Sequence, residues 1–462
     1  MQLFHRSHRL SASFDETNLV SVAGLVPARA LAVKTGLGDL ANKWLTLPGY
    51  FGANAGMKVT ALVAGMLAGA DSIDGMALLR HGGMKKLFVG TYAPSTLGSF
   101  LRSFSFGHVR QLDAVAARWL VNIAAVSPIV TGIGEYALVD IDDTIKEVHG
   151  YQKQGSGYGY SGVRGLNAPI GIVSTATAAP IIIGSRLRKG AAGSPRGAGK
   201  FIGDVLATVH RLRNASATGL VLLRADSAFY GHAVVSAAHR AGAKVSITAR
   251  MDPAVKRAIG TIADDAWTTI NYTDAIRDEA TGAWISSAEV AETAFTAFSS
   301  RKKSARIEGR LVMRRIPELN RKAGEGQPTL FETHRFHSFF TTSDLDTVTA
   351  DQTHRQHAII EQVNADLKDS ALAHLPEASS PRTRPGSCWQ PSLSTSRTPS
   401  APSRAPSWAK HAAPPFAASS SASRPASLPQ RGKSPCTCRQ AGPGKQAGRP
   451  HSRLPAGRPA TT

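Results

Sequence analysis

Apolar and polar positions in the middle of the chain alternate in the way typical of β-strands. Residues 136–142 alternate with a period of two, and the acids Asp140 and Asp142 stand near the end of this run. Two further strands are predicted at 168–175 and 180–187, where apolar residues dominate. Because the links are short, the three strands are expected to be neighbours.

The pattern then changes to alternating helices and strands. Helices are predicted at 199–213 and 234–241, and strands at 219–225 and 244–248. The resulting order is β-β-β-α-β-α-β. It predicts an α/β protein with a mixed sheet and helices on both faces.

Residues 251–340 interrupt this order. A short helix at 253–259 and strand-like runs at 306–315 and 334–342 predict a β-rich insertion. The last strong element is a helix at 351–369. Its apolar stripe consists of Ile359, Ile360, Val363 and Leu367. Another face carries His357, Glu361, Asn364 and Lys368, at i, i+4, i+7 and i+11.

The first 130 residues are predicted to be helical, because charges are sparse and large apolar residues recur at helical spacing. Ser95 or Thr96 is the expected N-cap of one helix. Two helices are expected to meet around Thr35 and Gly36. They are either ordinary packed neighbours, which we favour, or a short helix-turn-helix.

The length of the chain indicates its number of domains, and its charge indicates a candidate partner. The chain has 462 residues and a mass of 48.7 kDa, enough for two or three domains. Its 54 Lys and Arg residues exceed its 32 Asp and Glu residues, and the net charge of +22 indicates a polyanionic partner such as nucleic acid. Residues 378–462 hold 13 of these basic residues and no acidic one, so the rest of the chain carries only +9.

Three classes of protein are excluded at this stage. The N-terminus lacks the apolar core of a secretory signal. The longest uncharged run, between Arg164 and Arg186, is interrupted by prolines and is more typical of a buried hairpin than of a membrane span. All three cysteines lie in the last fifth of the chain, which excludes a disulfide framework or zinc cluster in the main body. A cytoplasmic protein is expected.

Acidic residues at predicted strand ends are the candidate catalytic residues. Asp140 and Asp142 share one strand face, Asp226 follows the fourth strand, and Glu361 extends from the last helix. Three such carboxylates suit two Mg²⁺ ions in phosphodiester chemistry. Alternatively, Asp226 caps the next helix and Glu361 is a solvated residue. Arg224 either orients Asp226 or pairs with an acid in the core.

Longer stretches resemble the DDE transposases of bacterial insertion sequences, in the group described as transposase DDE domain group 1. The stretches are ALVDIDDTIKEVHGYQKQGSGYGYSGVRGLNAPI, RLRKG, VLLRADSAFYG and TARMDP, with DSIDGMALLRHGGM and APSTLGSFLRSFSFGHVRQLD in the N-terminal part. The resemblance covers about residues 20–375. It implies a ribonuclease H-like mixed sheet with flanking helices, a helical N-terminal domain and a β-rich insertion before the last catalytic helix.

The resemblance also implies roles for the acids. Asp142, in an Asp-x-Thr pattern, is the first catalytic acid, with Asp140 as a nearby second choice. Asp226 is the second acid and Glu361 the third. Together these residues are expected to hold two Mg²⁺ ions, for which Mn²⁺ substitutes.

The sequence departs from the family in two places. Lys368 matches the family lysine seven residues after the glutamate, but His354 and His357 stand where a tyrosine and an arginine are usual, with Arg355 displaced by two positions. Contact with a phosphate then falls to His357 or Arg355. After residue 376, EASSPRTRPGS replaces the apolar helix that usually closes the core.

The segment 376–462 is rich in Pro, Ser and Arg and is predicted to be disordered. Three origins stay open: a basic arm that binds DNA phosphates, a linker, or translation of a GC-rich gene in a shifted frame, which we favour. A frameshifted product is expected to lack the last core helix and to be poorly stable or inactive. No gain in excision activity after restoring the frame would contradict this expectation.

Basic residues around the acids are the expected DNA contacts. They are Lys153, Arg164, Arg186, Arg188, Lys189, Arg355, His357 and Lys368. Tyr151, Tyr158 and Tyr160 either stack on bases or pack on a hairpin face. The resemblance implies double-stranded DNA as the partner, comprising terminal inverted repeats and target DNA. It also implies a dimer in a synaptic complex, a nucleoid location and no membrane.

The predicted organisation is a helical DNA-binding domain at 1–130, a catalytic core at 131–250 and 341–375, an insertion subdomain at 251–340 and the tail at 376–462. The predicted function is Mg²⁺-dependent cut-and-paste transposition.

Two alternatives stay open. One is a DNA-binding protein without catalysis. The other is a haloacid dehalogenase-like phosphatase, with Asp140 as nucleophile and Asp142 as general acid. That chemistry needs a loop followed by a helix after these residues, whereas a Gly- and Tyr-rich run follows here.

Overall fold

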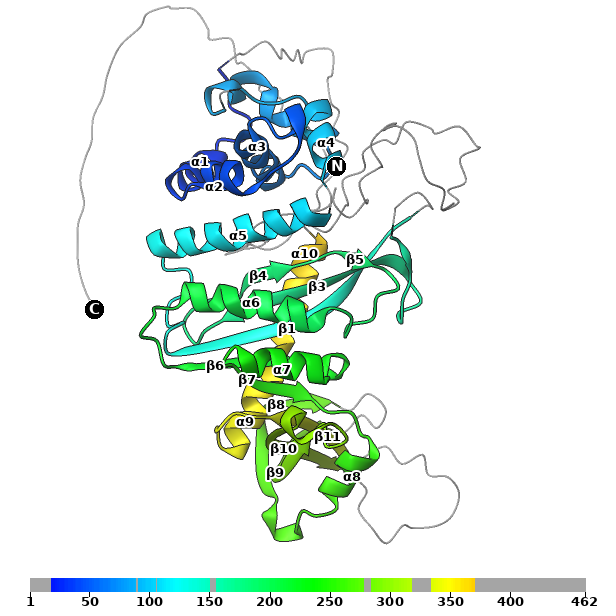
Figure 1. Cartoon of the computed structure of the whole chain (residues 1–462). Coiled ribbons are helices and arrows are strands. Elements are labelled where there is room, and N and C mark those ends of the chain that lie inside the picture. Colours follow the sequence, from blue (N-terminus) through cyan, green and yellow to red (C-terminus); the bar gives the residue numbers. More distant parts are fainter. Residues whose placement is uncertain are drawn as a thin grey trace, which may run out of the picture.

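A computed structural model describes residues 18–88, 90–104, 106–149, 155–277, 284–317 and 334–369. Helices near the N-terminus form one end of the molecule, and a sheet flanked by helices forms the rest (Figure 1). Lys153, Tyr151 and the tail predicted at 376–462 lie outside the described residues. No described helix combines the length and the apolar character needed to cross a membrane.

The N-terminal part is helical, as predicted. Its helices are α1 (Leu25–Lys34), α2 (Leu37–Trp44), α3 (Ala55–Leu67), α4 (Pro94–Arg102) and α5 (Phe106–Val126), with the 3-10 helices η2 (Gly49–Phe51), η3 (Asp74–Arg80) and η4 (Gly82–Lys86). Gly36, with a φ of 71°, separates α1 from α2 at the predicted turn. The predicted N-cap at Ser95 or Thr96 is wrong, because α4 begins earlier, at Pro94. Proline suits a first helical position, since its φ is already helical and its missing N–H has no partner to lose there.

Within the described residues, eleven strands form one sheet. The strands are β1 (Tyr136–Glu147), β2 (Gly157–Tyr158), β3 (Arg164–Ser174), β4 (Ile181–Ser185), β5 (Arg188–Lys189), β6 (Leu220–Ala225), β7 (Lys244–Thr248), β8 (Thr268–Arg277), β9 (Trp284–Ala297), β10 (Ile307–Pro317) and β11 (His334–Thr341). Their spatial order is β2-β3-β1-β6-β7-β11-β10-β9-β8, and β4 and β5 also pair with β3. β1, β6 and β7 run parallel, whereas β3 is antiparallel to β1. The predicted mixed sheet is confirmed, and its order is compatible with a ribonuclease H-like fold.

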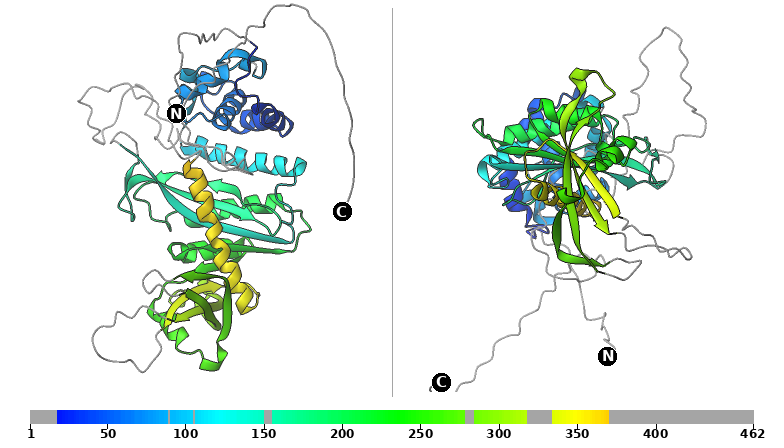
Figure 2. Two further views of the ribbon diagram at one scale, coloured as in Figure 1. Left: turned by 180° about the vertical axis from the view of Figure 1, so that it is seen from behind. Right: turned by 90° about the horizontal axis from the view of Figure 1, so that it is seen from below.

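Helices cover both faces of this sheet. α6 (Ala198–Leu212) and α7 (His232–Arg240) lie on one face, and α10 (Ile359–Asp369) crosses the other (Figure 2). α6 is amphipathic, and its apolar side packs with β1, β4 and β6 in the main core cluster. Ile360, Val363 and Leu367 of α10 pack on Ile170, Ile172 and Ile182 of β3 and β4. The fourth residue of the predicted apolar stripe, Ile359, is exposed instead. α10 therefore covers β3 and β4 on the face opposite α6 and α7.

The segment predicted as a β-rich insertion extends the same sheet. β11 pairs with β7 through Phe339, Phe340 and Thr341, so β8 to β11 continue the hydrogen-bonded ladder of the core. β10 and β11 confirm two predicted strands, whereas β8 and β9 were not predicted. In the AEVAETAFTA part of β9, small and polar residues outnumber large apolar ones, so the alternation is weak. α8 (Pro253–Ile259) and the 3-10 helices η6 (Asp264–Ala266) and η7 (Lys303–Ala305) complete this region.

The last predicted helix is interrupted. α9 (Thr347–Arg355) starts before the predicted helix, because the Asp346 carboxylate accepts a hydrogen bond from the Thr349 backbone N–H at 3.0 Å and caps it. The 3-10 helix η8 (Gln356–Ala358) then connects α9 to α10. The prediction of one continuous α-helix at 351–369 is therefore wrong in one respect, because the 3-10 helix η8 separates α9 from α10.

Candidate active site

Two acidic residues lie just past the last residues that pair between the parallel strands β1 and β6, Ile141 and Ala225. Asp142 lies on β1, and Asp226 follows the last residue of β6. Both line one groove of about 1320 Å³. Its basic residues are Lys146, Arg250 and Lys368, and its tyrosines are Tyr158 and Tyr160. The groove therefore places four acidic side chains, those of Asp142, Asp143, Glu147 and Asp226, among cationic and aromatic ones.

The Asp142 carboxylate is partly buried and held at both oxygens. Its Oδ2 accepts a hydrogen bond from the Asn364 side chain at 2.8 Å, and its Oδ1 accepts one from the Asp143 backbone N–H at 2.7 Å. Burial, aided by the nearby charge of Asp226, raises the pKa of Asp142 to about 6. A cation in the groove would favour the ionised form.

Asp226 follows β6 and precedes the 3-10 helix η5 (Ser227–Phe229). Its side chain accepts a hydrogen bond from the Ala228 backbone N–H at 3.1 Å, so the capping role considered from the sequence is present. Burial raises the pKa of Asp226, and the charge of Asp143 adds to this effect. Capping and exposure to the groove therefore occur together at this residue.

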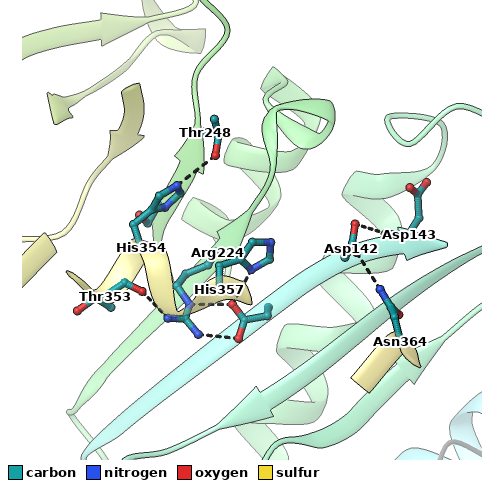
Figure 3. A network of polar contacts seen from close by, with 10 residues as sticks. Asp142, Asp143, Arg224, Thr248, Thr353, His354, His357 and Asn364 are labelled. Atoms are coloured by element: carbon teal, nitrogen blue, oxygen red, sulfur yellow. Dashed lines mark hydrogen bonds and ion pairs between the residues drawn. The ribbon is translucent and has the colours of Figure 1, made fainter. Parts of the chain in front are cut away.

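Asp140 is buried in a separate network, whose members Arg224, His357 and Thr353 are labelled in Figure 3. It pairs in register with Arg224 of β6, whose guanidinium donates to both carboxylate oxygens at 2.7 Å. The Asp140 side chain is 0% exposed and that of Arg224 1% exposed. His357 Nδ1 donates to Asp140 Oδ1 at 2.8 Å, and Arg224 Nη1 donates to the backbone carbonyl of Thr353. This network joins β1 and β6 to the α9–η8 segment, and it confirms pairing of Arg224 with an acid in the core.

The third predicted acid, Glu361, has an exposed side chain on α10. Residues 361, 364 and 368 lie on one edge of that helix, and Asn364 on this edge reaches Asp142. Within the described ranges, no three His, Cys, Asp or Glu side chains are close enough together to form a metal site. The structure thus brings Asp142 and Asp226 into one groove, whereas the exposed Glu361 does not line it.

Several residues predicted to contact DNA make contacts within the protein. Arg186 donates to Asp204 at 3.0 Å, and Arg355 donates to Asp351 at 2.8 Å. His357 is the partner of Asp140 described above. Arg164 pairs with Tyr158 between β3 and β2, and the side chain of Lys189 on β5 is exposed. Lys368, at the end of α10, lines the groove.

A network around Asp143, the neighbour of Asp142, was not predicted. Arg188 Nη2 donates to Asp143 Oδ2 at 2.9 Å, and Arg188 Nε donates to Asn167 Oδ1 at 2.8 Å. Asn167 Nδ2 also donates to Asp143 Oδ2 at 2.8 Å. Arg188, predicted as a DNA contact, thus fixes the residue beside Asp142. The available signal was alternation along β1, which places Asp143 on the face opposite Asp142.

The histidine where the family usually has a tyrosine is half-buried, and both of its ring nitrogens face hydroxyl groups. His354 Nδ1 lies 2.9 Å from Ser246 Oγ, its Nε2 lies 3.1 Å from Thr248 Oγ1, and its ring stacks on Phe339 at 4.1 Å. Burial, with smaller contributions from nearby positive charges, lowers the pKa of His354 to about 3. His354 is therefore neutral at pH 7.

We expect this histidine to make stability dependent on pH. Because its folded pKa lies below the unfolded value near 6.5, its contribution is complete above about pH 6.5 and is lost as pH falls toward 3. The free energy of unfolding of the wild type, minus that of His354→Gln, should fall by up to about 1.4 kcal/mol per pH unit in this range. Denaturant titrations of both proteins measure this difference. A constant difference across the range would contradict the assignment.

The phosphatase alternative is wrong. The chain remains in β1 up to Glu147 and returns as the antiparallel β3, so no loop and helix follow Asp140. Both Asp140 carboxylate oxygens are occupied by Arg224, and the side chain is closed to solvent. A nucleophile needs access to its substrate, which Asp140 does not have.

The family model described as "Transposase DDE domain group 1" matches residues 3–319. The match covers β1, β6, Asp142 and Asp226 and ends before α10, so it does not include Glu361. No curated protein matches the chain. The match spans more than half of the chain, and the mixed sheet is compatible with it. The chain therefore belongs to the DDE transposase family, in transposase DDE domain group 1.

Proposed function

We propose that this chain is a cut-and-paste transposase that cleaves phosphodiesters at the ends of a mobile element and joins the released 3′-hydroxyl to target DNA. The observation that carries the proposal is the placement of Asp142 of β1 and Asp226, which follows β6, in one groove that three basic side chains also line. Such a groove offers carboxylates for cations and cations for phosphates. Family membership supports DNA as the substrate.

The groove carboxylates fit a divalent metal. Asp142 and Asp226 supply oxygen ligands, which Mg²⁺ and Mn²⁺ prefer, and burial raises both pKa values in the absence of a cation. Glu361, on the same edge of α10 as Asn364, is the proposed third ligand. When bound, two such ions would activate the attacking oxygen and stabilise the leaving one. Asp140 is left out of this set because Arg224 holds both of its oxygens.

The chain's own side chains orient the carboxylates and the substrate. Asn364 and the Asp143 backbone N–H hold the Asp142 carboxylate in one orientation. Lys146, Arg250 and Lys368, which line the groove, are proposed to bind phosphate oxygens on either side of the scissile bond. A synaptic dimer that holds both element ends and acts at the nucleoid completes the proposal.

Removing the metal is expected to separate binding from cleavage. With DNA carrying the inverted repeats beside the gene, cleavage should occur in Mg²⁺ or Mn²⁺, stop in EDTA and return when either ion is restored. Gel-shift affinity at constant ionic strength should change much less, because basic side chains supply most of it. Denaturing gels and gel shifts measure the two quantities. Binding without cleavage in either metal would instead support a DNA-binding protein without catalysis.

A further inference from the structure

Two tyrosines stand exposed on the wall of the candidate active site. Tyr158 is 65% exposed and Tyr160 fully exposed, and both line the groove that contains Asp142 and Asp226. Tyrosine is enriched at interfaces, where its ring packs against another molecule. The position of these rings beside the carboxylates makes a ligand of the groove their natural partner.

The backbone beneath these rings is closely packed. Tyr158 pairs with Arg164 of β3, and the Gly162 N–H donates to the Gly159 carbonyl at 3.1 Å, which closes a tight turn around Tyr160. A Cβ atom on Gly159 would lie 2.7 Å from the carbonyl oxygen of Gly190, too close for any other residue. The two rings are therefore carried by a fixed turn. Their replacement leaves this packing unchanged, because it involves backbone atoms only.

The charged side chains of the groove indicate which class of ligand the two tyrosine rings contact. Lys146, Arg250 and Lys368 line the same groove and suit a phosphate chain. These basic side chains stand beside the four acids of the groove, Asp142, Asp143, Glu147 and Asp226. Aromatic rings next to basic side chains bind nucleic acids by stacking on the faces of bases. Within a duplex each base is covered by its neighbours, so only a terminal or unpaired base offers a free face.

We propose that Tyr158 and Tyr160 form a stacking platform for an unpaired base at the DNA end held in the groove. This inference rests on the proposed function, because it assumes that DNA enters with a phosphate near Asp142 and Asp226. The platform would bind the nucleotide next to that phosphate and favour a frayed end over an intact duplex. Besides the contacts with phosphates, the platform would thus contact a base, and this contact would not depend on the DNA sequence.

Binding of two probes to the full chain tests the platform. One probe is a blunt duplex, and the other is the same duplex with a three-nucleotide thymine overhang that contains 2-aminopurine. Both are used in EDTA at one salt concentration, and anisotropy gives the affinities. The wild type should prefer the overhang and quench its 2-aminopurine fluorescence. Tyr158→Ala with Tyr160→Ala should weaken binding of the overhang about 5- to 100-fold and leave binding of the blunt duplex unchanged.

Two further variants act as controls. Tyr158→Phe with Tyr160→Phe keeps the rings and should keep the preference. Tyr50→Ala removes a tyrosine that is 76% exposed in the N-terminal helical part and should change nothing. A wild type that binds both probes equally, or an alanine variant that retains the preference and the quenching, overturns the platform alone. A wild type that binds neither probe overturns the proposed function as well.

Discussion

Replacing Arg224 by leucine is expected to lower the free energy of unfolding by about 3–5 kcal/mol, the usual cost of leaving a buried charge without its partner. Arg224 and Asp140 are at most 1% exposed, and the arginine donates to both carboxylate oxygens. The variant also removes the contact with the Thr353 carbonyl, so α9 loses an attachment to the sheet. Urea titration of the purified variant measures the loss.

The matched control is an ion pair on the surface. Lys244 pairs with Asp344 at 3.1 Å, but their side chains are 41% and 90% exposed. Lys244→Met should cost less than about 1 kcal/mol. Combining Arg224→Leu with Asp140→Leu should recover much of the lost stability, because the unpaired carboxylate is gone. Equal costs for Arg224→Leu and Lys244→Met would show that the buried pair contributes no more than a surface pair.

Replacing Asp226 by asparagine is expected to abolish metal-dependent cleavage, with a loss of more than about 100-fold, and to leave DNA affinity within a few-fold of the wild type. Asparagine caps a helix about as well as aspartate, so the hydrogen bond from the Ala228 N–H can persist while the ligand charge is lost. Single-turnover cleavage of end-containing DNA and gel shifts measure the two effects. The thermal midpoint of the variant should not fall.

Asp252 provides the matched control. It caps α8, with its carboxylate accepting hydrogen bonds from the Ala254 and Val255 N–H groups at 2.9 Å. It does not line the groove. Asp252→Asn should therefore keep the cap and the cleavage rate. Cleavage retained in Asp226→Asn, or lost equally in both variants, would count against Asp226 as a catalytic residue.

Much of the core could be predicted because its signals are local. The strand at 244–248 and the helix at 253–259 coincide with β7 and α8, and α6 differs from its prediction by one residue at each end. Periodicity along a few residues is enough to define such elements. Acidic residues that follow apolar strands can likewise be recognised from the local sequence. The sequence by itself thus determined the order of the core elements and the candidate acids.

Strands with weak alternation depended on their neighbours. β9 became a strand because β8 and β10 pair with it on both sides, and β11 joined the insertion to β7. Such pairing involves residues distant in the chain. Its hydrogen bonds stabilise a strand whose own side chains carry little signal.

The roles of Asp140 and Asp142 were decided by tertiary structure alone. The period of two places both on the same strand face, so alternation cannot distinguish them. Asp140 pairs with an arginine 84 positions away, and Asp142 meets an asparagine 222 positions away while lining the groove. A periodic pattern identifies only the face of a strand on which a side chain lies. Burial beneath the covering helix and the partners available there decide that the Asp140 carboxylate is neutralised, whereas Asp142 is open to a ligand.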